Sequence, residues 1–156
     1  MPRRYFNWKL AIVLVVGLAV LCVTAFGLRQ WQKQNRAERG LVLGNKAYEE
    51  RRYEDAARHL GRYIGVHQDD VPALLKYADA QLKITPLKQN NVRQAISTYH
   101  IVLRADQANS EAATRLIELY LSMRMPGEAE LIAKKYLDTT QNPEVRRLLA
   151  MAMARQ

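Results

Sequence analysis

The feature that most constrains the fold of this chain is a helical pattern that returns three times in one register. Three segments align on an alanine: residues 51–64 on Ala56, residues 90–103 on Ala95 and residues 124–137 on Ala129. Apolar or small residues follow each alanine at offsets of four, seven and eight: Leu60, Tyr63 and Ile64; Tyr99, Val102 and Leu103; Ala133, Tyr136 and Leu137. These offsets lie on one face of an α-helix. The pattern therefore predicts three amphipathic helices that bury the same face.

A second helical pattern precedes each of these segments, and a polar break follows each of them. The breaks read HQDDVPAL, DQANSEAA and TQNPEVRR. They predict helix N-caps at Asp70, at Asn109 or Ser110, and at Asn142, with Pro143 in the first turn of the next helix. The sequence thus predicts three helix pairs and a final helix over 143–156. That helix either caps the array or begins a further unit.

The spacing of the units is close to constant. Ala95 and Ala129 are 34 residues apart, whereas Ala56 and Ala95 are 39 apart. We place the five extra residues in a loop at 83–91, where Pro86 and an Asn pair are typical of a loop.

The stretch 41–64 resembles a tetratricopeptide repeat, whose period is 34 residues. The matching positions are Leu43, Gly44, Tyr53, Ala56 and the pair Tyr63–Ile64. The chain departs from the family pattern at Gly40, where the family often has Trp, at Ile117, where it has a small residue, and at Gln68, Gln107 and Gln141, where it has Pro. The resemblance implies an all-α, right-handed superhelix over 37–156, with repeats at about 37–70, 71–109 and 110–142. The alternative is an ordinary helical bundle, which does not explain why the alanines and the breaks recur together.

A run of 19 residues without a charge, from Leu10 to Leu28, precedes the repeats. As a helix it spans roughly 28 Å, close to the hydrocarbon thickness of a bilayer. Aromatic residues at both ends, among them Trp8 and Trp31, suit the two membrane interfaces. We therefore expect a basic tail at 1–9, a transmembrane helix at 10–28 and a juxtamembrane linker at 29–36. The alternatives are a buried core helix and a cleaved signal peptide, whose apolar region is usually shorter.

Charge is concentrated next to this run. Residues 1–39 hold seven Lys/Arg and one acidic residue, while the other 117 residues carry only +3 of the total +9. Anionic lipid headgroups are the expected partner of the basic flanks, and no nucleic-acid partner is expected. The short basic tail favours an N-terminus in the cytoplasm. We expect a single-pass protein with its repeats outside the cytoplasm. A resemblance to bacterial envelope proteins that join an N-terminal anchor to tetratricopeptide repeats implies a bacterial inner membrane.

The chain lacks the motifs of common enzyme and metal sites. There is no GxxxxGK[ST], GxSxG, HExxH or GxGxxG sequence, and none of His59, His67 and His100 pairs with another at ligand spacing on a helix. The one cysteine, Cys22, lies in the apolar run and excludes an intrachain disulfide. We expect neither enzymatic activity nor a cofactor.

In the resembled family, the first helices of successive repeats line a groove that binds a partner protein or peptide. Carried over by register, the groove residues are Asn45, Tyr48, Glu49, Lys76, Asp79, Leu82, Arg115, Glu118 and Leu121. Some members hold a partner's C-terminal carboxylate in a basic clamp. Asn45 matches one asparagine of that clamp, and Lys76 and Arg115 are basic. Leu41 and Glu111 occupy positions where the clamp has lysines, so we expect a mixed-charge groove for a helix or an extended peptide.

The resemblance implies a membrane-anchored scaffold or adaptor that assists assembly of a membrane or envelope complex. The alternative within the same fold is a non-catalytic N-terminal part of a larger membrane enzyme or transport machine. A helical-repeat RNA binder is a third hypothesis, which the near-neutral repeats disfavour.

Overall fold

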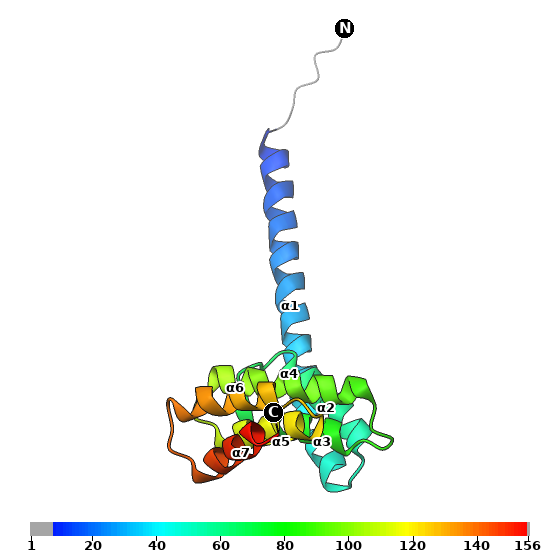
Figure 1. The fold of residues 1–156 in the computed structure, drawn as a ribbon. Coiled ribbons are helices and arrows are strands. Elements are labelled where there is room, and N and C mark those ends of the chain that lie inside the picture. The colour runs from blue at the N-terminus through cyan, green and yellow to red at the C-terminus, as the bar shows by residue number, and fades with distance from the viewer. Residues whose placement is uncertain (1–7, 156) are drawn as a thin grey trace. The chain divides into compact units, whose positions relative to one another are not determined.

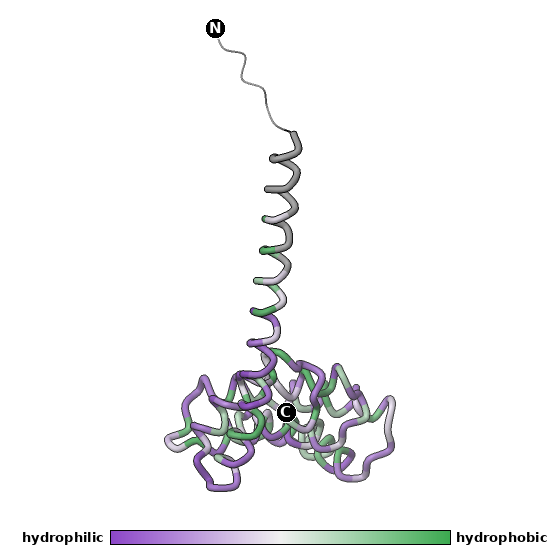
Figure 2. The backbone as a smooth tube through the Cα atoms, turned by 180° about the vertical axis from the view of Figure 1, so that it is seen from behind, coloured by the Kyte–Doolittle hydropathy of each residue, from purple (hydrophilic) through white to green (hydrophobic). Residues whose placement is uncertain are grey.

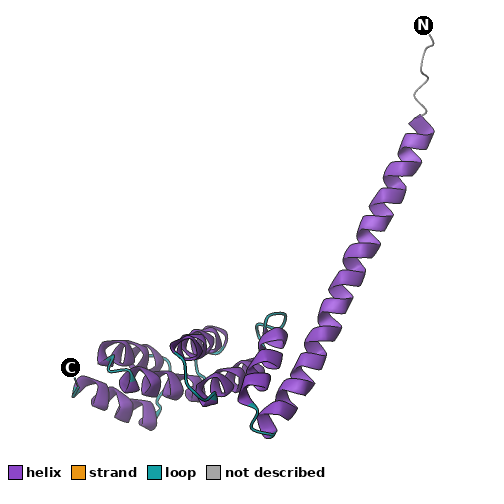
Figure 3. Ribbon diagram, turned by 90° about the vertical axis from the view of Figure 1, so that its right-hand side faces the viewer, coloured by secondary structure: helices purple, strands orange, loops and turns teal. Residues whose placement is uncertain are grey.

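The computed structural model describes residues 8–155, with side chains for residues 17, 18, 21, 22 and 24–155. The regular elements in this part of the chain are helices joined by loops (Figure 3). They are α1 (Trp8–Glu49), α2 (Tyr53–Ile64), α3 (Val71–Lys83), α4 (Gln89–Ala105), α5 (Ser110–Ser122), α6 (Pro126–Leu137) and α7 (Pro143–Met153) (Figure 1). The chain divides into two compact units, Met1–Arg36 and Ala37–Gln156.

The first unit contains the larger part of helix α1. Residues 29–36, treated above as a linker, continue this helix without a break. Within the described residues, no helix combines the length and the hydropathy needed to cross a bilayer. Residues 1–7 of the expected basic tail, and several side chains of the expected span 10–28, lie outside the described residues, so the transmembrane helix stays a prediction.

The second unit is a solenoid of helical hairpins. The end of α1 pairs with α2, α3 pairs with α4, and α5 pairs with α6, while α7 packs on both α5 and α6. Each helix has a buried side and a solvated side, and hydrophobic and hydrophilic stretches alternate along the tube (Figure 2). The predicted all-α solenoid of three helix pairs and a final helix is confirmed.

Side-chain caps define where α3, α5 and α7 begin. The carboxylate of Asp70 accepts from Ala73 N at 3.0 Å, and the amide oxygen of Asn109 accepts from Ala112 N at 2.9 Å. Asn142 caps α7, which has Pro143 in its first turn. A cap satisfies one of the backbone N–H groups that have no partner in the first turn. The three predicted caps are confirmed, and Asn109 rather than Ser110 is the second.

Two hairpin turns repeat the same backbone geometry. Arg51 and Arg124 have positive φ angles of 59° and 57°. Each lies five residues before the buried alanine of its second helix, Ala56 or Ala129. In both turns the next amide reaches back into the first helix, with Arg52 N to Ala47 O at 2.8 Å and Met125 N to Tyr120 O at 2.9 Å. The repeat therefore extends to the backbone of the turns.

The middle hairpin has a different turn, and part of our prediction for it is wrong. We placed residues 83–91 in a loop, but α3 includes Lys83 and α4 already begins at Gln89. The Asn pair lies in the first turn of α4, where Asn91 Nδ2 donates to Gln81 Oε1 at 2.7 Å. This contact across the hairpin fixes Asn91 in a helix that its type alone disfavours.

The aligned alanines lie in the core of the solenoid. Ala56, Ala95 and Ala129 have no exposed surface, and neither has Ile117, which occupies a small-residue position of the family. One continuous apolar cluster reaches from Leu74 in α3 to Ala152 in α7. Hairpins that share a core in this way stabilise one another, because none can bury its apolar face alone.

Candidate partner-binding surface

The predicted groove residues lie on α1, α3 and α5, which are the first helices of the three hairpins. Asn45, Tyr48 and Glu49 lie on α1, Lys76, Asp79 and Leu82 on α3, and Arg115, Glu118 and Leu121 on α5. We refer to the side of the solenoid formed by these positions as the inner face. Its two halves differ: polar residues of α1 and α3 contact one another, whereas Arg115 and Glu118 of α5 are exposed.

Polar contacts close the inner face between α1 and α3. Lys76 Nζ donates to Asn45 Oδ1 at 2.8 Å, and the Tyr48 hydroxyl donates to Asp79. Lys83 Nζ lies 2.6 Å from Asp79 Oδ2 and donates to the Tyr48 hydroxyl at 2.9 Å. Asn45, Tyr48, Lys76 and Asp79, which register assigned to a binding groove, therefore hold α1 and α3 together.

Lys83 is the centre of this contact, and our reading of the sequence missed it. Its ammonium lies 5.1 Å from the centre of the Tyr48 ring and 5.6 Å from that of Tyr53, within range of cation–π attraction. The hydrogen bond to Asp79 raises the pKa of Lys83, and burial raises the pKa of Tyr48, so both stay protonated at neutral pH. The signal that could have found Lys83 is its i,i+4 spacing from Asp79.

The α5 part of the inner face carries exposed charges. Arg115 and Glu118 form an ion pair at 3.6 Å with about half of each side chain exposed. A pair this exposed contributes on the order of 0–1 kcal/mol and opens readily. Both residues line a hollow of about 270 Å³, together with Glu111 from α5 and Glu144 from α7. Three carboxylates and one guanidinium give this hollow a negative potential.

Tyr99 lies beneath this surface. The side chain projects from α4 and is only 2% exposed, and burial raises its pKa to about 12. The charges of Asp79 and Glu111 raise the pKa further, whereas Arg115 lowers it. The charges of Asp79 on α3 and of Glu111 and Arg115 on α5 therefore all act on Tyr99.

Leu121 is almost completely buried. It is 8% exposed and lies in the apolar cluster of α3 to α7, so it offers a partner little surface. Leu82 is half-buried and packs against the same cluster. Register alone does not reveal the burial of Leu121, because burial at the end of α5 depends on how that helix packs against its neighbours.

Among the described residues, no group of three His, Cys, Asp or Glu side chains is placed to hold a metal ion. His59, His67 and His100 lie apart from one another: His67 faces Glu38 at 3.3 Å, and His100 contacts the Tyr120 hydroxyl at 3.2 Å.

Residues 87–152 match the family described as Tetratricopeptide repeat. This part of the chain is therefore similar to tetratricopeptide repeats. A comparison with curated protein sequences gives no match.

The similarity in fold to known tetratricopeptide-repeat domains extends over most of the chain. The first such domain of Spaghetti (RPAP3), bound to the HSP90 peptide SRMEEVD, superposes with a TM-score of 0.58 at 15% identity, covering 78% of this chain and 93% of that one. The domain of Arabidopsis OM64 gives 0.60 at 18% identity, covering 80% and 99%. The TPR2B domain of yeast Sti1, in complex with an Hsp70 peptide, gives 0.58 at 14% identity, covering 78% and 98%.

In the described residues, the solenoid of this chain lacks a basic inner face. Leu41, at one position where a carboxylate clamp has lysine, is half-buried against Ala37, Tyr63 and Ala73. Glu111, at the other, is exposed and acidic. Lys76, a basic residue of the predicted groove, already donates to Asn45. Glu111 and Glu118 would repel a segment with several carboxylates, because the charges have the same sign.

Proposed function

We propose that this protein is a membrane-tethered adaptor whose inner face binds a segment of a partner protein at α5. The observation that carries the proposal is the contrast within the inner face. The α1 and α3 side chains are engaged with one another, while Glu111, Arg115 and Glu118 are exposed beside a preformed hollow. Solvated charges next to a concave surface are available for a partner, whereas the α1–α3 contacts have first to be broken.

The charge of this surface indicates the chemistry of the segment. The structurally similar domains of Spaghetti and of yeast Sti1 are recorded with chaperone peptides, in one case the acidic SRMEEVD. Here the net negative hollow disfavours such a peptide and favours one with Lys or Arg. The adaptor therefore takes a basic or mixed-charge segment.

Peptide titrations test this proposal. Fluorescence anisotropy of the full-length protein in mild detergent compares labelled SRMEEVD with SRMKKVK bearing an amidated C-terminus. We expect the basic peptide to bind more tightly, to weaken as salt rises, and to lose affinity in Glu118→Lys. Tighter binding of SRMEEVD at low salt refutes the proposed charge preference. Equal, salt-independent binding of both refutes a role for these charges.

The tethering part of the proposal is supported by the uncharged run 10–28 and its basic flanks. Such a tether raises the effective concentration of the repeats towards other membrane proteins. Cys22, the one cysteine of the chain, gives a direct test, because its side chain is exposed in the structure. We expect a water-soluble maleimide to label Cys22 in detergent but not in sealed membranes. Equal labelling in both contradicts the tether.

A further inference from the structure

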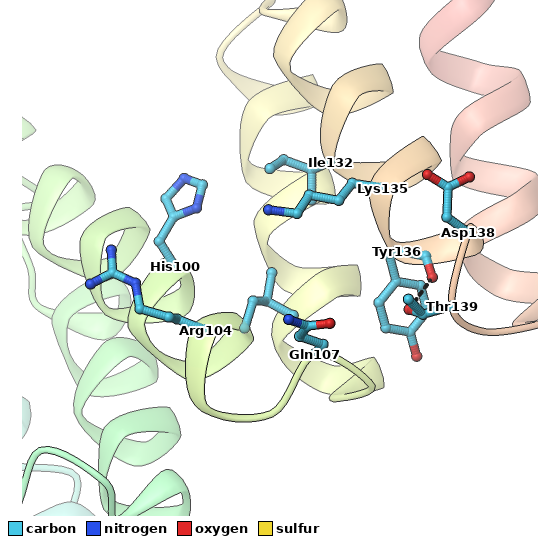
Figure 4. Close-up of a pocket in the computed structure, with 9 residues that line it drawn as sticks. His100, Arg104, Gln107, Ile132, Lys135, Tyr136, Asp138 and Thr139 are labelled. Carbon is cyan, nitrogen blue, oxygen red and sulfur yellow. Dashed lines mark hydrogen bonds between the residues drawn. The ribbon is translucent and has the colours of Figure 1, made fainter.

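A second concave site lies on the other side of the hairpins, between the second helices α4 and α6. It is a pocket of about 440 Å³. His100 and Arg104 of α4 form one wall, and Ile132, Lys135 and Tyr136 of α6 form the other (Figure 4). None of these residues belongs to the inner face, which is formed by the first helices.

Contacts on both sides of the pocket hold it open without a ligand. The Tyr136 hydroxyl donates to Ala108 O at 3.1 Å and so joins α6 to the turn after α4. The Thr139 hydroxyl donates to Tyr136 O at 3.0 Å and fixes the end of α6. On the α4 wall, His100 Nε2 lies 3.2 Å from the Tyr120 hydroxyl. A preformed pocket costs a ligand little ordering free energy.

The pocket has two cations without partners. Among the described residues, neither Arg104 nor Lys135 forms an ion pair, although the adjacent Lys134 pairs with Glu130. Burial lowers the pKa of His100, while Lys135 and Arg104 lower it further and Glu128 opposes them. Asp138, at the far end of the pocket in Figure 4, is the one acidic residue in the lining. Two cations and one carboxylate leave the lining with a net positive charge.

Apolar side chains lie beside these cations. Leu103 and Ile132 line the pocket and pack against the main apolar cluster, so their positions are fixed by the core. A ligand that fits must place an aliphatic group on Leu103 and Ile132 and an anionic group within reach of Arg104 and Lys135. Small-molecule and peptide pockets often combine an apolar floor with a few directing charges in this way.

We propose that this outer pocket binds a short segment of a partner protein in which a carboxylate directly follows an aliphatic side chain, as at a C-terminal leucine. The side chains of Arg104 and Lys135 indicate that the bound group is an anion, here a peptide carboxylate. The volume of the pocket and the apolar side chains of Leu103 and Ile132 indicate an aliphatic side chain next to that carboxylate. The protein then has two docking sites of opposite charge, one on each side of its hairpins.

N-acetyl-leucine is the smallest probe with both groups, and its titration tests the proposal. We follow amide shifts of the ¹⁵N-labelled full-length protein in detergent micelles, with N-acetyl-leucinamide and N-acetyl-glycine as matched probes. N-acetyl-leucine should shift amides around Leu103, Gln107 and Ile132. Each matched probe should bind about fivefold or more weakly, because it lacks either the charge or the aliphatic group. Equal shifts with all three probes, or none with any, overturn the proposal.

Variants separate the outer pocket from the inner face. Arg104→Gln combined with Lys135→Gln should abolish the N-acetyl-leucine shifts, while the control Lys134→Gln and the inner-face variant Glu118→Lys should leave them unchanged. Unchanged thermal unfolding of the double variant shows that it folds. Retained binding in the double variant overturns the proposal, as does inorganic phosphate binding as tightly as N-acetyl-leucine. Glu118→Lys affects the basic peptide alone, so the two sites fail or succeed independently.

Discussion

Replacing Gly44 by alanine tests whether the first hairpin is packed as tightly as the structure shows. A Cβ added at Gly44 would lie 2.7 Å from Leu60 Cγ, 2.9 Å from Leu60 Cδ2 and 3.1 Å from the Leu60 backbone N. Leu60 is completely buried, so it has no space into which to turn. The two helices must therefore move apart to accept one methyl group.

The expected magnitude is a balance of two terms. Alanine in the interior of a helix is favoured over glycine by about 0.5–1 kcal/mol. Overpacking a filled core costs about 1–3 kcal/mol, and the backbone contact places this site in the upper part of that range. Gly44→Ala should therefore lower the free energy of unfolding by about 1–2 kcal/mol, which corresponds to a fall in Tm of roughly 3–8 °C.

Gly127→Ala is the matched control. Gly127 lies in the first turn of α6, and a Cβ there would meet nothing within 4 Å. It should leave stability unchanged or raise it by up to about 0.5 kcal/mol, because only the helix preference remains. Urea unfolding of the full-length protein, followed by far-UV circular dichroism, measures both variants. If Gly44→Ala is as stable as Gly127→Ala, the close approach of α1 to α2 is refuted.

Three further changes test the turns, the inter-repeat contacts and the buried histidine. Arg124→Gly should raise the free energy of unfolding by about 0.5–1 kcal/mol in urea titrations, because it relieves a left-handed residue at φ 57°; a loss of stability argues against the turn. Tyr48→Phe should cost about 1 kcal/mol by removing its hydrogen bonds to Asp79 and Lys83, and the loss should shrink in an Asp79→Ala background, where only the bond from Lys83 remains. Burial, with Lys135 and Arg104, lowers the pKa of His100 from its ordinary 6.5, and Glu128 opposes this. Protonation on acidification thus favours the unfolded chain, and His100→Gln should lose less stability than the parent between pH 7 and pH 5; an identical loss refutes this cause.

The periodic features of this fold are predictable from the sequence. Each hairpin buries a small residue at the same position of its second helix, so the burial of Ala56, Ala95 and Ala129 can be predicted from their spacing. The caps at Asp70, Asn109 and Asn142 follow from side-chain chemistry that acts within one turn of helix. Features fixed by local chemistry or by period are visible in the chain before it folds.

Features that depend on one particular contact between helices are not visible in this way. The helical position of Asn91 rests on its bond to Gln81, and the burial of Leu121 rests on the packing around α5. Register placed Asn45 and Lys76 on one face but did not reveal that they bind each other, 31 residues apart. The outer pocket also depends on how α4 and α6 pack, and no motif marks it.

Site-specific photo-crosslinking in intact cells tests whether the inner face contacts a partner protein at α5. We place p-benzoylphenylalanine either at position 115 on the inner face or at position 58, where Arg58 is exposed on α2 and pairs with Asp55. We expect one discrete crosslinked partner from position 115 and none from position 58. The product from position 115 should be lost when Glu111→Lys is added. The same products from both positions, or a product indifferent to Glu111→Lys, would contradict it.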